Sequence, residues 1–241
     1  MNKINENLKK YIYVANLVRL PGYLNFGITE FKALMRYYKI NCTIDENYEY
    51  CAKSNPFMKF YTNEELNCDV ITQFYGRSVL IKCIYRLLSK GKGFENFIKN
   101  VEYEKDLSIL EDINSNKTFR FYVEGNEYSI SKEEQSKIIN SLEFLNFIAK
   151  VDLKKPERVF YVNYNKNNDE YLFGRLIGNL SNDVKFYVKY DLDKRKYLGP
   201  TSLDNKLAFV MCNLAEIGKG SVVYDPFTGT GSLLIPATYF G

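Results

Sequence analysis

The chain has 241 residues, of which 46% are hydrophobic and 26% are charged, and its formal net charge is +4. This composition is typical of a globular protein with room for two modest domains, and no apolar run approaches the length of a membrane span. The sequence contains no histidine, which excludes serine–histidine and cysteine–histidine catalysis and histidine metal sites within this chain.

The cysteines are dispersed and form no CxxC pair, which argues against a zinc ribbon and against a disulfide framework. Free thiols of this kind favour a reducing compartment, the cytosol or the nucleus, and of these we expect the cytoplasm. The five positions are Cys42, Cys51, Cys68, Cys83 and Cys212.

The chain opens with a predicted strand over residues 10–16 and an amphipathic helix over 28–38, which Thr29 would cap. Further strands are predicted over 48–53 and 57–61. The helix has an apolar face formed by Phe31, Leu34, Met35 and Tyr38. This βαββ order is compatible with a ferredoxin-like α+β unit.

A second helix is predicted over residues 77–88, and its spacing gives it a cationic stripe. Lys82, Arg86 and Lys90 recur every four residues, so they would share one face. Two interpretations stay open at this point: a stripe that contacts phosphates, or an ordinary solvated helix face.

Downstream, a strand is predicted over 118–123. Ser131 and Glu134 have the spacing of a capping box at the start of a helix that ends near residue 142. Further strands are predicted over 160–164, 171–177 and 184–190.

Basic residues gather at two places in the second half of the chain. The first lies around a connecting strand that Pro156 ends, and the second is a triplet in a turn. We interpret both as candidate phosphate contacts, although a solubilising turn explains the triplet equally well. The residues are Lys150, Lys154 and Lys155, and then Lys194, Arg195 and Lys196.

A helix is predicted over residues 203–214, with Thr201 or Ser202 as its cap. The expected buried stripe consists of Leu207, Val210, Met211 and Leu214.

The most informative segment follows this helix. Residues 222–224 predict a buried strand, Gly229 and Gly231 a turn with unusual φ angles, and 232–240 a helix. Pro236 either kinks that helix or lies in its first turn. A strand, glycine turn and helix in this order bind a nucleoside-containing cofactor at the carboxyl end of the strand.

Two other nucleotide motifs fit this turn less well. A P-loop needs a Lys-Ser/Thr pair after its last glycine, where this chain has Ser232 and Leu233. The dinucleotide fingerprint needs a third glycine or alanine, where Leu234 stands.

The residues at 225–234, DPFTGTGSLL, resemble the first motif of amino-group methyltransferases. Segments at 119–147, 151–162, 171–178 and 194–215 resemble successive parts of one family. That family is the catalytic subunit of eukaryotic tRNA guanosine-10 N2-methyltransferase, an enzyme with a THUMP domain. The resemblance is good from about residue 119 onward and thinner before it.

The resemblance implies an α+β amino-terminal region, ferredoxin-like plus THUMP-like, and then the start of an α/β Rossmann-like class I methyltransferase domain, truncated after its first glycine motif. The corresponding domains are an RNA-binding region at 1–150, a linker at 151–160 and an incomplete methyltransferase domain at 161–241.

The resemblance also implies S-adenosylmethionine as cofactor, with tRNA and a small zinc-binding activator subunit as partners. The cofactor pocket would be lined by Asp225, Phe227, Gly229, Thr230 and Gly231. Thr201 and Ser202 would fold over the cofactor, although helix capping explains these two residues equally well.

The activity implied is methyl transfer to the exocyclic N2 of guanosine-10 in tRNA. The family orients that amine with an Asp/Asn-Pro-Pro-Tyr motif, which this sequence lacks. We therefore expect the chain by itself to be an inactive fragment that retains tRNA binding. The alternatives are a non-catalytic THUMP-type RNA-binding protein and, less favoured by the residues before the turn, a fragment of a DNA amino-methyltransferase.

Overall fold

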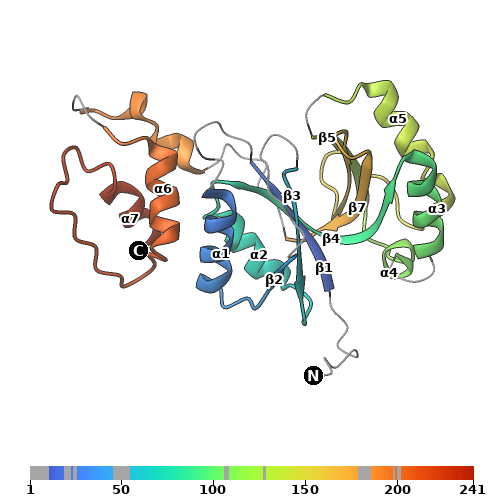
Figure 1. The fold of residues 1–241 in the computed structure, drawn as a ribbon, viewed down its shortest axis with the longest axis horizontal. Helices are drawn as coiled ribbons and strands as arrows, with labels where there is room; N and C mark the ends of the chain where they lie inside the picture. Colours follow the sequence, from blue (N-terminus) through green and yellow to red (C-terminus); the bar gives the residue numbers. More distant parts are fainter. Residues whose placement is uncertain are drawn as a thin grey trace.

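The computed structural model describes residues 11–18, 23, 26–45, 55–105, 109–126, 129–178, 186–197, 199 and 202–241. Its centre is a seven-stranded sheet in the order β2-β3-β1-β4-β7-β6-β5 (Figure 1). The strands are β1 Tyr11–Leu17, β2 Thr43–Ile44, β3 Phe57–Thr62, β4 Ile81–Lys92, β5 Phe119–Gly125, β6 Arg158–Asn165 and β7 Glu170–Leu176.

The first half of the sheet has the order expected of a ferredoxin-like unit. Strands β1 to β4 alternate with α1 (Phe26–Tyr37) and α2 (Cys68–Tyr75), and every neighbouring pair is antiparallel. The predicted first strand, first helix and strand at 57–61 are confirmed. Thr29 lies inside α1 and does not cap it, because the helix begins at Phe26. The strand predicted at 48–53 falls outside the described residues.

The predicted helix over residues 77–88 is wrong, because most of this segment is β4. Nearly every apolar side chain of the strand is buried, on both of its faces. A strand buried on both faces has a continuous apolar run and loses the alternation that distinguishes it from a helix. The i, i+4 spacing of Lys82, Arg86 and Lys90 is also compatible with one face of a strand.

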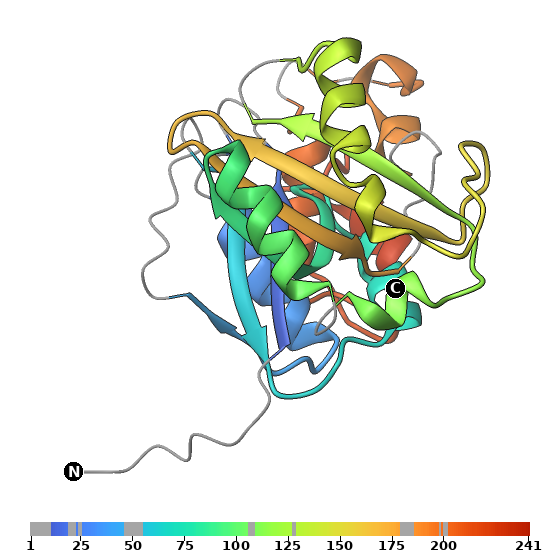
Figure 2. The same ribbon diagram turned by 90° about the vertical axis from the view of Figure 1, so that its right-hand side faces the viewer.

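The second half of the sheet carries α3 (Phe94–Glu104), α4 (Leu110–Ile113) and α5 (Lys132–Asn140). Figure 2 shows α3 and α5 in front of the strands. The predicted capping box of α5 is present, since Ser131 Oγ accepts the Glu134 N–H at 3.2 Å and the Glu134 carboxylate accepts the Ser131 N–H at 3.0 Å.

The sheet curls so that its helix-free face turns inward. Lys59 on β3 and Glu170 on β7 form an ion pair at 3.0 Å, although β1 and β4 lie between their strands. In a flat sheet these strands would be about 14 Å apart, at about 4.8 Å per strand. The inner face buries Val14, Phe57, Cys83, Tyr85, Tyr161 and Leu172. The helices therefore lie outside, α1 and α2 against one half and α3 to α5 against the other (Figure 1).

Gly174 of β7 permits this close packing. A Cβ atom at this position would lie 2.4 Å from both the Arg86 carbonyl oxygen and the Tyr85 ring. Strands β6 and β7 belong to this curled sheet, although the sequence analysis assigns most of their residues to the second domain.

The described residues between 186 and 241 form a separate layer against α1 (Figure 1). They contain the 3₁₀ turns Phe186–Tyr190 and Leu192–Lys194, α6 (Asn205–Leu214) and α7 (Leu234–Phe240). The strand predicted at 184–190 is wrong over 186–190, where the chain forms the first of these turns. Pro236 is the third residue of α7, as one of the two interpretations requires.

The predicted buried stripe of α6 is largely wrong. Of its four residues only Val210 is buried, and Met211 is 40% exposed. The helix packs against α1 on one side and against α7 and the 186–190 turn on others, so its buried surface is broader than one stripe. The buried residues are Asn205, Ala208, Phe209, Val210, Cys212 and Asn213.

Candidate functional site

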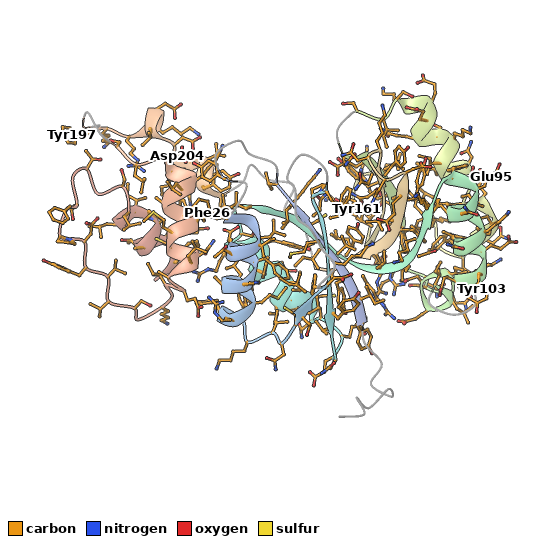
Figure 3. All side chains as sticks on the ribbon, viewed as in Figure 1. Phe26, Glu95, Tyr103, Tyr161, Tyr197 and Asp204 are labelled. Atoms are coloured by element: carbon orange, nitrogen blue, oxygen red, sulfur yellow. The ribbon has the colours of Figure 1, made fainter. Side chains whose placement is uncertain are left out.

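A basic groove of about 670 Å³ opens where β5 and β6 begin and β7 ends. Of the described residues that line it, six are cationic and one, Glu157, is acidic. The cationic residues are Lys117, Arg120, Lys154, Lys155, Arg158 and Arg175. Tyr122 and Tyr161 also line the groove, and Figure 3 shows Tyr161 between the two halves of the sheet.

Two of these cationic residues, Arg158 and Arg175, form ion pairs with carboxylates of the protein itself. Asp112 is 3% exposed and accepts hydrogen bonds from Arg158 and, at 2.8 Å, from Arg175. Arg175 also pairs with Glu65 at 3.2 Å. Burial alone would lower the pKa of Arg175, but Asp112 and Glu65 raise it above its ordinary value. We assign Arg158 and Arg175 mainly to the architecture of the groove.

Lys154 and Lys155 are held at the groove by a short turn. Asp152 accepts the backbone N–H groups of Lys154 at 2.8 Å and Lys155 at 3.0 Å. These two hydrogen bonds, that of Lys155 foremost, lower the pKa of Asp152. Both lysines are exposed, and neither forms an ion pair among the described residues. Their charges are therefore available to a ligand.

Arg120 and Tyr122 bring a cation and an aromatic ring together. The Arg120 guanidinium lies 5.6 Å from the centre of the Tyr122 ring, and its Nη1 donates to the Leu153 carbonyl at 3.2 Å. Its Nε is buried without a hydrogen-bond partner. Tyr122 is 36% exposed; its ring packs on Tyr161 at 5.0 Å between ring centres and lies 6.0 Å from Lys82 Nζ, and a base would stack on the part that stays open.

The remaining predicted phosphate contacts lie elsewhere. Lys82 pairs with Glu124, and Arg86 pairs with Glu65 at 3.3 Å, so both are partly neutralised. Lys90 and Lys150 are exposed but do not line the groove.

The three residues of the basic triplet, Lys194 to Lys196, lie in different surroundings. Lys194 donates to the Val188 carbonyl at 2.7 Å, and Lys196 is exposed. Arg195 instead donates to Ser232 Oγ at 2.9 Å, beside the glycine turn.

Lys117, Arg120 and Tyr122 also line the groove, although no pattern in the sequence predicts them there. Arg120 and Tyr122 stand two apart on β5, so strand alternation alone predicts that they share a face. The parallel pairing of β5 with β6 then places that face beside Val159 and Tyr161. No local pattern in the sequence predicts that β5 pairs with β6.

The glycine turn has the backbone angles that the motif predicts. Gly229 has φ +53° and Gly231 has φ +74°. Asp225 Oδ1 accepts the Phe227 N–H at 2.9 Å, and the Gly231 N–H donates to the Thr228 carbonyl at 2.8 Å. Among the described residues, a Cβ built on Gly231 would meet no atom within 4 Å, which leaves space beside the turn for a ligand.

The strand predicted before the turn is wrong. Residues 222–224 have no strand geometry, and Val222 and Tyr224 are 97% and 85% exposed. A strand needs a neighbour for its backbone hydrogen bonds, and no described strand lies beside this segment. Phe227, predicted as an apolar wall of the pocket, is 91% exposed.

The structure does bring Ser202 to the turn. Ser202 Oγ lies 3.2 Å from Thr230 Oγ1, which in turn lies 3.4 Å from Ser232 Oγ. Ser202 does not cap α6, because Asp204 accepts the Leu207 N–H at 3.0 Å in that role. Thr201, the other predicted cover residue, lies outside the described residues. The open space, the hydroxyl groups and Arg195 fit a small polar cofactor.

Within the described part of the chain no helix is long and apolar enough to cross a membrane. No group of three or more metal-ligating side chains occurs among the same residues.

Two family models match the chain. The Tmrp11 THUMP N-terminal domain matches residues 14–179, and the RMKL-like methyltransferase domain matches residues 193–241. The groove residues all lie within the first match, and the glycine turn lies within the second.

Curated relatives point to the same family. The tRNA (guanine(10)-N(2))-methyltransferase TRMT11 of Mus musculus is 30% identical over 244 residues, which cover 98% of this chain and 50% of the relative. The tRNA (guanine(10)-N(2))-methyltransferase of Saccharomyces cerevisiae is 32% identical over 251 residues, covering 97% and 53%. The chain thus spans about half the length of the curated relatives it matches.

A solved structure shares the fold. The crystal structure of TrmN from Thermus thermophilus has a TM-score of 0.51 at 17% identity, and the match covers 96% of this chain and 62% of that chain. Sequence and structure together show that the chain belongs to the family of tRNA G10 N2-methyltransferases homologous to TRMT11, with a THUMP N-terminal domain followed by part of a methyltransferase domain.

Proposed function

We propose that this chain binds tRNA through the basic groove and supplies the cofactor-facing turn of an enzyme that methylates the exocyclic N2 of guanosine-10. The observation that carries the proposal is the groove itself. It combines uncompensated lysines with an exposed tyrosine, and it lies inside the segment that matches the THUMP domain.

In this proposal Lys117, Lys154 and Lys155 neutralise phosphates, while Tyr122 stacks on an unpaired base. Lys82, Arg86, Lys90 and Lys150 contribute long-range attraction, because they lie outside the groove or face carboxylates. Lys194 and Lys196 have the same lesser role.

The glycine turn would hold S-adenosylmethionine, which supplies an activated methyl group when bound. The Gly229 to Gly231 backbone would face its methionine part, and Ser202 and Thr230 would close over it. Asp225 would accept a hydrogen bond from the methionine amino group. Phe227 and Thr201 remain proposals from the family resemblance alone, as does a zinc-binding activator subunit.

We also propose a domain boundary between residues 179 and 193. Strands β6 and β7 complete the sheet that carries the groove, and the two family models match on either side of this interval. This boundary replaces the linker expected at 151–160.

A non-catalytic tRNA-binding role is the second candidate. It requires only the groove residues and makes no use of the glycine turn. Both candidates require tRNA binding, so the groove is the first feature to test.

The test is a titration of fluorescently labelled, unmodified tRNA at several salt concentrations. We expect Lys154→Ala/Lys155→Ala to weaken binding and to reduce the log–log salt slope by about 1.4 to 1.8, the release expected from two phosphates. Lys32→Ala/Lys219→Ala removes two exposed lysines outside the groove and serves as the control. Equal affinity and slope in both double variants would refute the groove as the tRNA site.

A further inference from the structure

The layer formed by α6 and α7 is joined to the ferredoxin-like unit by a buried polar cluster. Figure 1 shows α6 beside α1, and the two helices are in contact. Between them lie Glu30 of α1, Arg77 from the turn before β4, and Asn213 of α6. Their exposed fractions are 0%, 7% and 0%. The proposed catalytic role of the chain does not use any of them.

The Glu30 carboxylate accepts hydrogen bonds from both sides of the contact. Its two oxygens accept the backbone N–H groups of Val79 at 3.0 Å and Leu80 at 2.7 Å. The first oxygen also accepts from Asn213 Nδ2 at 2.7 Å. Hydrogen bonds to a buried charge are among the stronger ones in proteins, because water cannot replace them.

Asn213 is bonded to Arg77 at both ends of its amide. Its Nδ2 donates to the Arg77 carbonyl at 2.9 Å, and its Oδ1 accepts from Arg77 Nε at 3.2 Å. Arg77 Nη2 donates further to the Ile217 carbonyl, just beyond the end of α6. Every contact of this amide therefore crosses from α6 to the ferredoxin-like unit.

Aromatic rings close the cluster from two sides. The Arg77 guanidinium lies 4.1 Å from the ring centre of Tyr37 on α1 and 3.9 Å from that of Phe240 on α7. A guanidinium between two rings gains cation–π attraction and is shielded from water. Arg77 thus touches α1, α6 and α7 at once.

We infer that Arg77 and Asn213 are positioning residues that hold α6 and α7 on the ferredoxin-like unit as one body. The groove and the glycine turn lie on the two sides of this contact, so the cluster fixes one relative to the other. Only this consequence rests on the proposed function. An exposed ion pair, Arg36 with Glu216 at 2.7 Å, spans the same contact, but its side chains are 61% and 37% exposed. Exposed pairs of this kind contribute little.

The test is hydrogen–deuterium exchange of the whole chain, read by mass spectrometry. We expect Arg77→Met and Asn213→Leu to raise amide exchange in α6 and α7 by about tenfold or more, since each leaves buried polar groups unpaired. Exchange in β1, β3 and β4 should stay unchanged. Arg36→Gln is the matched control, and α6 exchange should rise less than about fivefold in it.

A general loss of stability would instead accelerate exchange throughout the sheet. If either buried variant does so, Phe240→Ala decides, because it leaves every hydrogen bond of the cluster in place and removes only the ring that covers Arg77 and packs on Phe186 and Phe209. We expect a rise of about 2- to 30-fold confined to α6 and α7 in that variant. Unchanged exchange there, or an equal rise in β4, would overturn the inference. The measurement needs neither tRNA nor cofactor, so its result is independent of the proposed function.

Discussion

Ser202 and Thr230 meet across 28 residues of sequence, with their hydroxyl oxygens 3.2 Å apart. The contact joins the segment before α6 to the glycine turn that precedes α7. These are the two segments from which the sequence analysis assembles a cofactor site. The close approach of Gly199 to the Thr230 methyl group, 2.9 Å for an added Cβ, shows how tightly they pack.

We expect Gly231→Val to abolish binding of S-adenosylhomocysteine, measured by calorimetry. The φ of +74° strains any β-branched residue, at a cost of about 1–2 kcal/mol in unfolding free energy. Gly220→Val is a matched control, since Gly220 has φ +84° and equally open surroundings but lies outside the turn. Both variants should lose similar stability, and only Gly231→Val should affect the ligand. Equal ligand binding in both would make the turn structural.

The chain by itself should transfer no methyl group to tRNA. The exocyclic amine of guanine is a poor nucleophile and needs oriented hydrogen-bond acceptors, and this sequence has no Asp/Asn-Pro-Pro-Tyr motif to supply them. The measurement is incorporation of label from S-adenosylmethionine into unmodified tRNA. Incorporation at guanosine above a no-protein control would contradict the expectation.

Asp112→Ala should destabilise the protein by about 3–5 kcal/mol, because it leaves Arg158 and Arg175 partly buried without their common partner. Urea unfolding followed by circular dichroism measures the change. The exposed pair gives the comparison: Arg36→Gln should cost at most about 1 kcal/mol. Similar costs for the two variants would show that Asp112 is not the centre of a buried network.

Burial raises the pKa of Cys83 to about 12 and that of Cys212 to about 11. A raised thiol pKa lowers the reactive thiolate fraction at any pH below it. Cys68 is exposed at the edge of the groove. Brief alkylation at pH 8 should therefore modify Cys68 well before Cys83 and Cys212. Equal labelling of the three under native conditions, read by peptide mass spectrometry, would contradict the burial of β4 and α6.

Local sequence patterns correctly predict the structural features that depend on residues only a few positions apart. The capping box at Ser131, the amphipathic α1 and the positive φ angles of the glycine turn all have this character. The sequence predicts a helix where β4 lies, because a strand packed on both faces shows no alternation of apolar and polar residues.

The groove depends on longer-range relationships. Lys154 and Lys155 stand out in the sequence as a basic cluster, but Arg120 and Tyr122 join them only through the parallel pairing of β5 with β6 and the curl of the sheet. The cluster of Glu30, Arg77 and Asn213 cannot be predicted from a local pattern either, because 183 residues separate Glu30 from Asn213.

The most direct test of the central claim is photo-crosslinking of 4-thiouridine-substituted tRNA to the protein, with the modified peptides identified by mass spectrometry. We expect crosslinks in the peptides that line the groove, around Lys117 to Tyr122 and Lys154 to Val159. Lys154→Ala/Lys155→Ala should reduce both. Crosslinks confined to the outer helices α1 and α3, unaffected by that variant, would contradict the assignment of this groove as the tRNA-binding surface.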